Sequence, residues 1–204
     1  YQGVKNLMPV TINGDGSIAG LSVGGLGSGV VNTATLANGA ATGAKLGTGS
    51  VIQKVQNLTY TRAAINSVTF VATAHSVTIT PTLASSKILL NFSAMINTNA
   101  NNARAFVDVY RSINGGTFTG IAPMGSAGTT GASQSQGFLD EVRGDSSRIQ
   151  VPFNIHYLDS PSYSVGNAIV YKLYMRTNDT SYTVELPTNN NLGPVINMAT
   201  EVKG

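Results

Sequence analysis

Hydrophobic and polar residues alternate with a period of two along much of the chain after residue 50. In the clearest stretch the apolar residues share one face: Ile88, Leu90, Phe92, Ala94 and Ile96. Successive side chains of a strand point to opposite faces of a sheet, so this alternation predicts a strand with one buried face. The stretches 148–157 and 169–176 follow the same rule. In the first of these, Pro152 lies on the polar face and predicts an edge strand or a bulge, because proline donates no backbone hydrogen bond.

Shorter alternating runs extend the prediction over the rest of this half of the chain. They are 51–61, 68–72, 76–80, 104–113, 138–142, 181–186 and 195–202. Gly, Asn, Pro and Ser separate the runs and predict turns between them. About ten strands without a long helical pattern predict an all-β fold, an antiparallel β-sandwich or jelly roll. One face of each strand is expected to meet solvent, as antiparallel sheets allow.

The first 50 residues have a different composition. They hold 12 of the 23 glycines, and Tyr1 is their one aromatic residue. Glycine loses much backbone entropy on ordering and small side chains bury little area, so this segment is not expected to fold alone. It is either a flexible linker or a segment that winds with identical copies around a shared core, and its recurring apolar residues favour the second. We therefore predict a glycine-rich stalk over 1–50 and a β-sandwich head over 51–204.

Charge and cysteine content exclude several classes of protein. Charged residues make up 10% of the chain and the net charge is +3, without the Lys/Arg cluster that nucleic-acid binding needs. The chain has no cysteine, so it forms no disulfide or thiolate metal site. No apolar run approaches about 18 residues, so we expect no membrane span.

Candidate catalytic groups are few and scattered. His75 and His156 are the only histidines, and both are expected to be solvated rather than metal ligands. Asp108, Asp159 and Asp179, with the adjacent pair 140–141, are the carboxylates considered for a glycosidase pair. Neighbours on a strand point to opposite faces, and none of these carboxylates lies in a recognisable acid or nucleophile context. We therefore expect solvated carboxylates and turn formers, no enzyme activity, no cofactor and no metal. The tripeptide at 143–145 (Arg-Gly-Asp) is expected to be a turn.

Tyrosines flanked by amide and hydroxyl groups are the candidate binding residues, because a sugar offers C–H faces to a ring and hydroxyl edges to polar groups. Two loops have this composition, and the asparagine-rich stretches 97–104 and 189–191 resemble exposed tip loops. Binding commonly lies on loops of a rigid scaffold. The candidates are Tyr157, Asp159, Tyr163, Asn178, Asp179, Tyr182 and Arg104. The alternative is that these tyrosines cap the core.

Five segments carry a resemblance to a known family. They read GSVIQKVQ at 49–56, ITPTLASSKILL at 79–90, VYR at 109–111, YKLYMRT at 171–177 and INMATEV at 196–202. In this order they resemble the C-terminal domains of bacteriophage tail fibres, cyanophage fibres especially. The upstream segment 14–26 is similar to the linker that such fibres place before the tip. The chain departs from the pattern at Lys54 and in the Gly/Ser-rich stretch 120–137.

The resemblance implies a homotrimeric, virion-borne tail fibre tip that adsorbs to a bacterial surface glycan or outer-membrane receptor. Upstream fibre or tail proteins are then the remaining partners. A closed threefold assembly would also supply the shared core that the glycine-rich segment needs. The alternatives are a structural virion protein, such as a capsid decoration or fibre connector without receptor binding, and a polysaccharide depolymerase.

Overall fold

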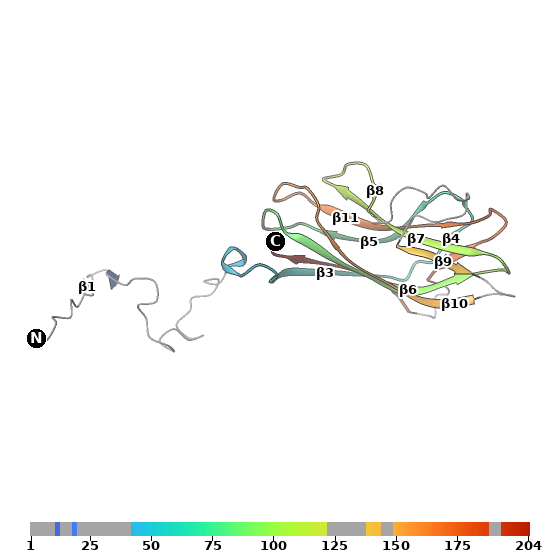
Figure 1. Ribbon diagram of the computed structural model, residues 1–204, viewed down its shortest axis with the longest axis horizontal. Helices are drawn as coiled ribbons and strands as arrows, with labels where there is room; N and C mark the ends of the chain where they lie inside the picture. Colours follow the sequence, from blue (N-terminus) through green and yellow to red (C-terminus); the bar gives the residue numbers. More distant parts are fainter. Residues whose placement is uncertain (1–10, 13–17, 20–41, 122–137, 144–148, 188–192) are drawn as a thin grey trace, which may run out of the picture. The chain divides into compact units, whose positions relative to one another are not determined.

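The chain divides into two compact units, Tyr1–Thr42 and Gly43–Gly204. The computed structural model describes residues 11–12, 18–19, 42–121, 138–143, 149–187 and 193–204. In the first unit, β1 (Thr11–Ile12) and β2 (Ile18–Ala19) pair antiparallel. The second unit begins with a short 3-10 turn, η1 (Gly43–Lys45), and is otherwise built from strands (Figure 1).

Two antiparallel sheets form the second unit (Figure 1). The β6 sheet runs in the order β3 (Val51–Thr59), β13 (Val195–Val202), β6 (Lys87–Thr98), β12 (Val184–Leu186) and β4 (Ala63–Ile65), and β10 (Ile149–Asp159) also pairs with β6. The β11 sheet runs in the order β5 (Val71–Ile79), β11 (Ile169–Thr177), β7 (Arg104–Ile113) and β8 (Thr119–Gly120), and β9 (Leu139–Arg143) also pairs with β7. The predicted all-β, antiparallel architecture is confirmed, and the two sheets are consistent with the predicted β-sandwich.

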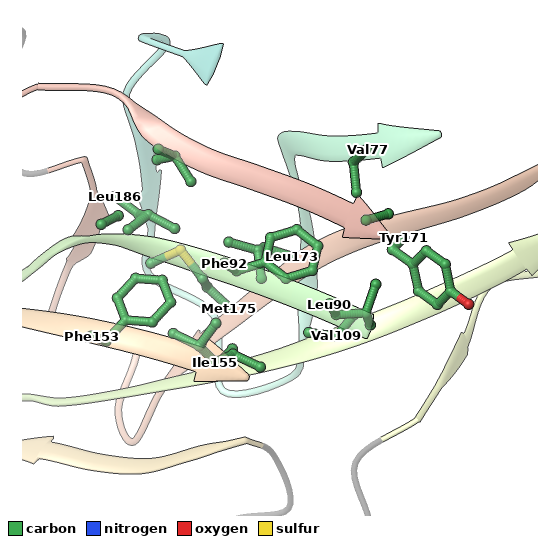
Figure 2. Close-up of a cluster of buried hydrophobic side chains, with 14 of the residues drawn as sticks. Val77, Leu90, Phe92, Val109, Phe153, Ile155, Tyr171, Leu173, Met175 and Leu186 are labelled. Carbon is green, nitrogen blue, oxygen red and sulfur yellow. The ribbon is translucent and has the colours of Figure 1, made fainter. Parts of the chain in front are cut away.

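The hydrophobic core lies between the two sheets. Figure 2 shows Phe92 of β6, Phe153 of β10, and Leu173 and Met175 of β11 filling the same space. All five predicted apolar residues of 88–96 are buried, which confirms the inward face of β6. Most residues on the opposite faces of the strands are polar or partly exposed, because the pleat turns every second residue away from the core.

Strand bounds agree closely with the alternation where it is uninterrupted. The runs 104–113 and 195–202 coincide with β7 and β13. Pro152 is exposed on β10, which pairs with β6 alone among the described strands, so the predicted edge position is confirmed. The two runs predicted at 68–72 and 76–80 are instead one strand, β5. Its inward positions include Thr73 and His75, and these polar residues interrupted the apolar pattern.

Different loops lie at the two ends of the second unit, which we call the proximal and the distal pole. At the proximal pole, where η1 precedes β3, the backbone N–H of Gly49 donates to the carbonyl of Lys203 over 2.8 Å. Asp159 pairs with Ile88 at this end, so the loops 80–86 and 160–168 also lie there. At the distal pole, the N–H of Asn99 donates to the carbonyl of Thr183, which joins the loops 99–103 and 178–183. The described part of the chain contains no helix with the length and hydropathy to cross a membrane.

Candidate functional site

Four predicted binding residues meet at the distal pole: Arg104, Asn178, Asp179 and Tyr182. The Arg104 backbone N–H donates to Asn178 Oδ1 over 2.8 Å, and Asn178 Nδ2 donates to the Asn102 carbonyl over 3.2 Å. Asp179 Oδ1 accepts a 2.8 Å hydrogen bond from the N–H of Ser181, and the Asp179 carbonyl accepts one from the N–H of Tyr182. Hydrogen bonds from Ser181 lower the pKa of Asp179. These contacts order the loop and leave Asp179 exposed.

Asp159 is buried near the proximal pole, so its expected solvation is wrong. Arg111 Nη1 donates to its two oxygens over 2.8 and 2.7 Å, and the Tyr171 hydroxyl donates to Oδ2 over 2.8 Å. Burial and the neighbouring Asp159 charge raise the pKa of Tyr171. Asp159 belongs to the β6 sheet, whereas Arg111 and Tyr171 belong to the β11 sheet. The carboxylate therefore joins the two sheets.

The two remaining candidates, Tyr157 and Tyr163, pack against the core. The Tyr157 ring meets Phe138 edge-on, with 4.9 Å between ring centroids. The Tyr163 hydroxyl donates to the Leu83 carbonyl over 2.7 Å. Tyr163 also lines a hollow of about 370 Å³ at the proximal pole, between the loops 80–86 and 160–168. Its lining is Ser85, Ser86, Lys87, Ser160, Pro161, Ser162 and Tyr163.

The histidines differ in environment. His156 is exposed on β10, as expected. His75 is fully buried in β5, so the expectation that it is solvated is wrong. Its Nε2 lies 3.0 Å from the Leu186 carbonyl, which it can reach as an N–H donor, and burial lowers the pKa of the ring. In the described ranges, no three His, Asp or Glu side chains gather as metal ligands would.

Asp108 is also buried, contrary to the expectation of a solvated carboxylate. It lies on the outward face of β7, because its neighbours Val107 and Val109 enter the core. Burial raises the pKa of Asp108 to about 6, although the N–H of Val109, 2.7 Å from Oδ1, opposes this. Asp108 faces away from the core and Asp159 points between the sheets, so these two carboxylates do not form a glycosidase pair.

Aromatic rings and cations gather on the outer face of the β11 sheet. We call this group the aromatic face; its members are Phe70, Phe106, Tyr110, Phe118, Lys172, Tyr174 and Arg176. The Tyr110 and Tyr174 rings stack at a centroid distance of 3.8 Å and an interplanar angle of 18°. The Phe118 ring lies 6.1 Å from that of Tyr174, and the Phe70 ring lies 6.2 Å from that of Tyr110.

Each cation of the aromatic face lies over a ring. Lys172 Nζ is 4.9 Å from the Phe118 centroid. Arg176 Cζ is 3.9 Å from the Phe106 centroid and 5.4 Å from that of Phe70. Such contacts attract a cation to the electron-rich ring face and hold its side chain in place. All members except buried Phe106 are partly exposed, so a ligand can reach them.

The aromatic face was missed by sequence reasoning because its members come from separate segments. The antiparallel register places Lys172 opposite Tyr110, Tyr174 opposite Asp108, and Arg176 opposite Phe106. Alternation along each strand identified the outward positions but not their cross-strand neighbours. The sequence did contain one indication of this face: the outward positions of 104–112 and of 170–176 both carry aromatic and cationic residues.

Some predicted features lie outside the described residues. These are most of the predicted glycine-rich stalk over 1–50, the side chains of the carboxylate pair 140–141, the Gly-Asp part of the tripeptide at 143–145 and the asparagines of 189–191. Asn97 and Thr98, expected in an exposed loop, are instead buried in β6. No protein-family model matches the chain, and no curated protein matches it.

Proposed function

We propose that this chain is the receptor-binding head of a bacteriophage tail fibre, carried on the virion, and that it attaches to a bacterial surface glycan. The aromatic face is the observation that carries the proposal. Sugars present apolar C–H faces that pack on aromatic rings, and their hydroxyls bond to the polar groups beside those rings. Tyr110 and Tyr174 form a stacked pair on a sheet, a rigid scaffold for such a contact. The ordered resemblance of five segments to tail fibre domains supports the same function.

The proposed head acts by binding and performs no reaction. Asp108 and Asp159, the described buried carboxylates first considered for catalysis, point to different sides of the β11 sheet. The Asp159 carboxylate already accepts hydrogen bonds from Arg111 and Tyr171. A depolymerase would release reducing ends from host polysaccharide, and we expect none.

A homotrimer joined to upstream fibre or tail proteins is part of the proposal, and the outer face of the β6 sheet supports it. From Leu89 to Met95, the outward positions of β10, β6 and β13 carry no carboxylate, lysine or arginine. Leu89, Met198 and Ile196 lie among serine, threonine and asparagine on this face, and Leu158 is 44% exposed. Copies of such a face can approach without charge repulsion, and apolar side chains gain by leaving water.

The same face fits the alternative of a structural virion protein, since a connector also needs a surface that packs on other proteins. The two functions differ in one observable property. A receptor-binding head labels host cells as an isolated protein, whereas a connector does not.

Cell labelling with the fluorescent full-length chain tests the proposal on a panel of bacteria, with polysaccharide-stripped cells as control. We expect a strain that is labelled only while its polysaccharide is intact. Tyr174→Ala removes half of the stacked pair and should weaken labelling by about tenfold, equivalent to ~1.4 kcal/mol. Tyr60→Ala is the matched control, because Tyr60 is 59% exposed and lies outside the aromatic face.

Two results would contradict the proposal. One is the absence of labelling on every strain, which would favour the connector. The other is equal labelling by wild type and Tyr174→Ala, which would place the receptor site elsewhere, for instance at the distal pole.

A further inference from the structure

The order of side chains along the outward positions of β11 places one ring between two cations. Lys172, Tyr174 and Arg176 alternate with the core residues Leu173 and Met175. At ~3.3 Å per residue, the two cations start from backbone positions roughly 13 Å apart. This span matches a short stretch of polysaccharide rather than a single small ion.

The aromatic rings hold these cations near the surface. Lys172 Nζ contacts the Phe118 ring, and no carboxylate of the described residues lies within ion-pair distance of it. Arg176 lies on the Phe106 ring and donates a 3.3 Å hydrogen bond from Nη1 to the Thr177 carbonyl. A cation–π contact uses the ring face and leaves ammonium N–H donors available for an anionic ligand.

Asp108, the carboxylate on the outward faces of β7 and β11, is withdrawn from the surface. Asp108 lies opposite Tyr174 but is 5% exposed. Gly120 covers it so closely that a Cβ there would lie 3.0 Å from Asp108 Oδ2. Burial also raises the pKa of this carboxyl, which lowers its charge near pH 6. The described side chains that the aromatic face presents to solvent are therefore aromatic and positively charged.

We infer that the aromatic face binds an acidic glycan, with sugar C–H faces on its rings and a sugar carboxylate at Lys172. This inference rests on the proposed function and adds the chemical class of the receptor. A neutral sugar would use the rings alone, whereas a carboxylate-bearing sugar also uses the Lys172 ammonium group. Charge-assisted hydrogen bonds from a fixed cation are stronger than neutral ones, so the acidic sugar is favoured.

The test uses polysaccharide extracted from the strain that the chain labels, before and after chemical reduction of its carboxyl groups to alcohols. We expect reduction to weaken binding of the full chain by at least about tenfold. Lys172→Gln should weaken binding to the unreduced polysaccharide by about five- to tenfold and should have little effect on binding to the reduced one. Lys172→Arg should retain most of the affinity, since it keeps the charge.

Lys54→Gln is the matched control, because Lys54 is an exposed lysine of the β6 sheet and its loss changes the net charge equally. Equal binding before and after carboxyl reduction would overturn the inference while cell labelling still supported the adhesin. Equal loss from Lys54→Gln and Lys172→Gln would also overturn it, because net charge alone would then explain the binding. Absence of any labelled strain would instead refute the proposed function.

Discussion

The structure differs most from the sequence-based expectations in the burial of individual polar side chains. Asp108, Asp159 and His75 were expected in solvent and are buried. Glu201, which lies in the segment 196–202 but was not considered as a site residue, is also buried and accepts hydrogen bonds from Gln53, Thr82, Leu83 and Ser86. Burial tends to raise the pKa of Glu201, but these hydrogen bonds together lower it. Most of these contacts come from residues far away in the chain, so the local pattern could not reveal them.

Asp108 predicts a pH dependence of stability at the residue scale. The folded-state pKa of about 6 exceeds the ordinary value of 3.8, so between these pH values the folded state holds the proton more tightly than the unfolded state. The contribution of Asp108 to the free energy of unfolding is therefore greatest below about pH 4 and declines as the pH rises to about 6. The full decline is about 3 kcal/mol, since each pKa unit corresponds to about 1.4 kcal/mol.

Asp108→Asn should stabilise the fold at pH 7 by up to about 3 kcal/mol, because it removes the charge and keeps an oxygen for the N–H of Val109. Urea unfolding from pH 4 to pH 8 measures this, and the difference between wild type and variant isolates the contribution of Asp108. Asp179→Asn is the control at an exposed carboxylate. A variant less stable than wild type at pH 7 would contradict the prediction.

At the scale of elements, the two sheets are joined by polar contacts as well as by the apolar core. The contact of Asp159 with Arg111 and Tyr171 crosses from β10 to β7 and β11. The side chains of Arg111 and Asp159 are 22% and 7% exposed, so solvent screens this pair only weakly. β10 is a sheet edge, and this contact fixes its last residue to the opposite sheet.

Asp159→Asn should destabilise the fold by about 3 kcal/mol, because it leaves a largely buried guanidinium without its carboxylate. The double variant with Arg111→Met should recover part of this loss, since it removes the unpaired charge. Urea unfolding of the two single variants and the double variant forms a double-mutant cycle. Additive effects of the two substitutions would show that the pair is not coupled.

At the scale of the whole molecule, the outer faces of the two sheets differ in chemistry. The β11 sheet presents the aromatic face with its cations. The outward positions of β10, β6 and β13 in the β6 sheet present apolar and polar side chains without carboxylate, lysine or arginine from Leu89 to Met95. The first suits an acidic glycan and the second suits a copy of the same chain. This division of roles leaves the aromatic face exposed in the proposed trimer.

Light scattering of the full chain should give a mass near three chains. Leu89→Lys with Met198→Lys should shift the mass toward one chain, because like charges would meet in the interface. Val165→Lys, at a site that is 54% exposed in a proximal loop, is the control and should leave the mass unchanged. Circular dichroism would show that the strands persist. A stable monomer of the unmodified chain would refute the homotrimer.

The sequence by itself determined which segments are strands and which of their residues face the core. Alternation is a local property of the backbone, and it correctly placed β6, β7, β10, β11 and β13 and the edge position of Pro152. The very short β4 and β8 carry too few residues for a period to be recognised. The sequence pattern did not predict β5 as one continuous strand, because the inward residues Thr73 and His75 are polar and interrupt the alternation on which the prediction depends.

Only the tertiary structure decided which strands are neighbours and in what register. The aromatic face exists because antiparallel pairing sets Lys172, Tyr174 and Arg176 beside Tyr110, Asp108 and Phe106. Arg111 and Asp159 are 48 residues apart in the chain, and Gln53 and Glu201 are 148 apart. Alternation within one strand carries no information about the residue across the ladder or across the core. The sequence therefore supplied the inward and outward faces, and the packing of the two sheets determined which polar groups are buried and which side chains form a surface for binding.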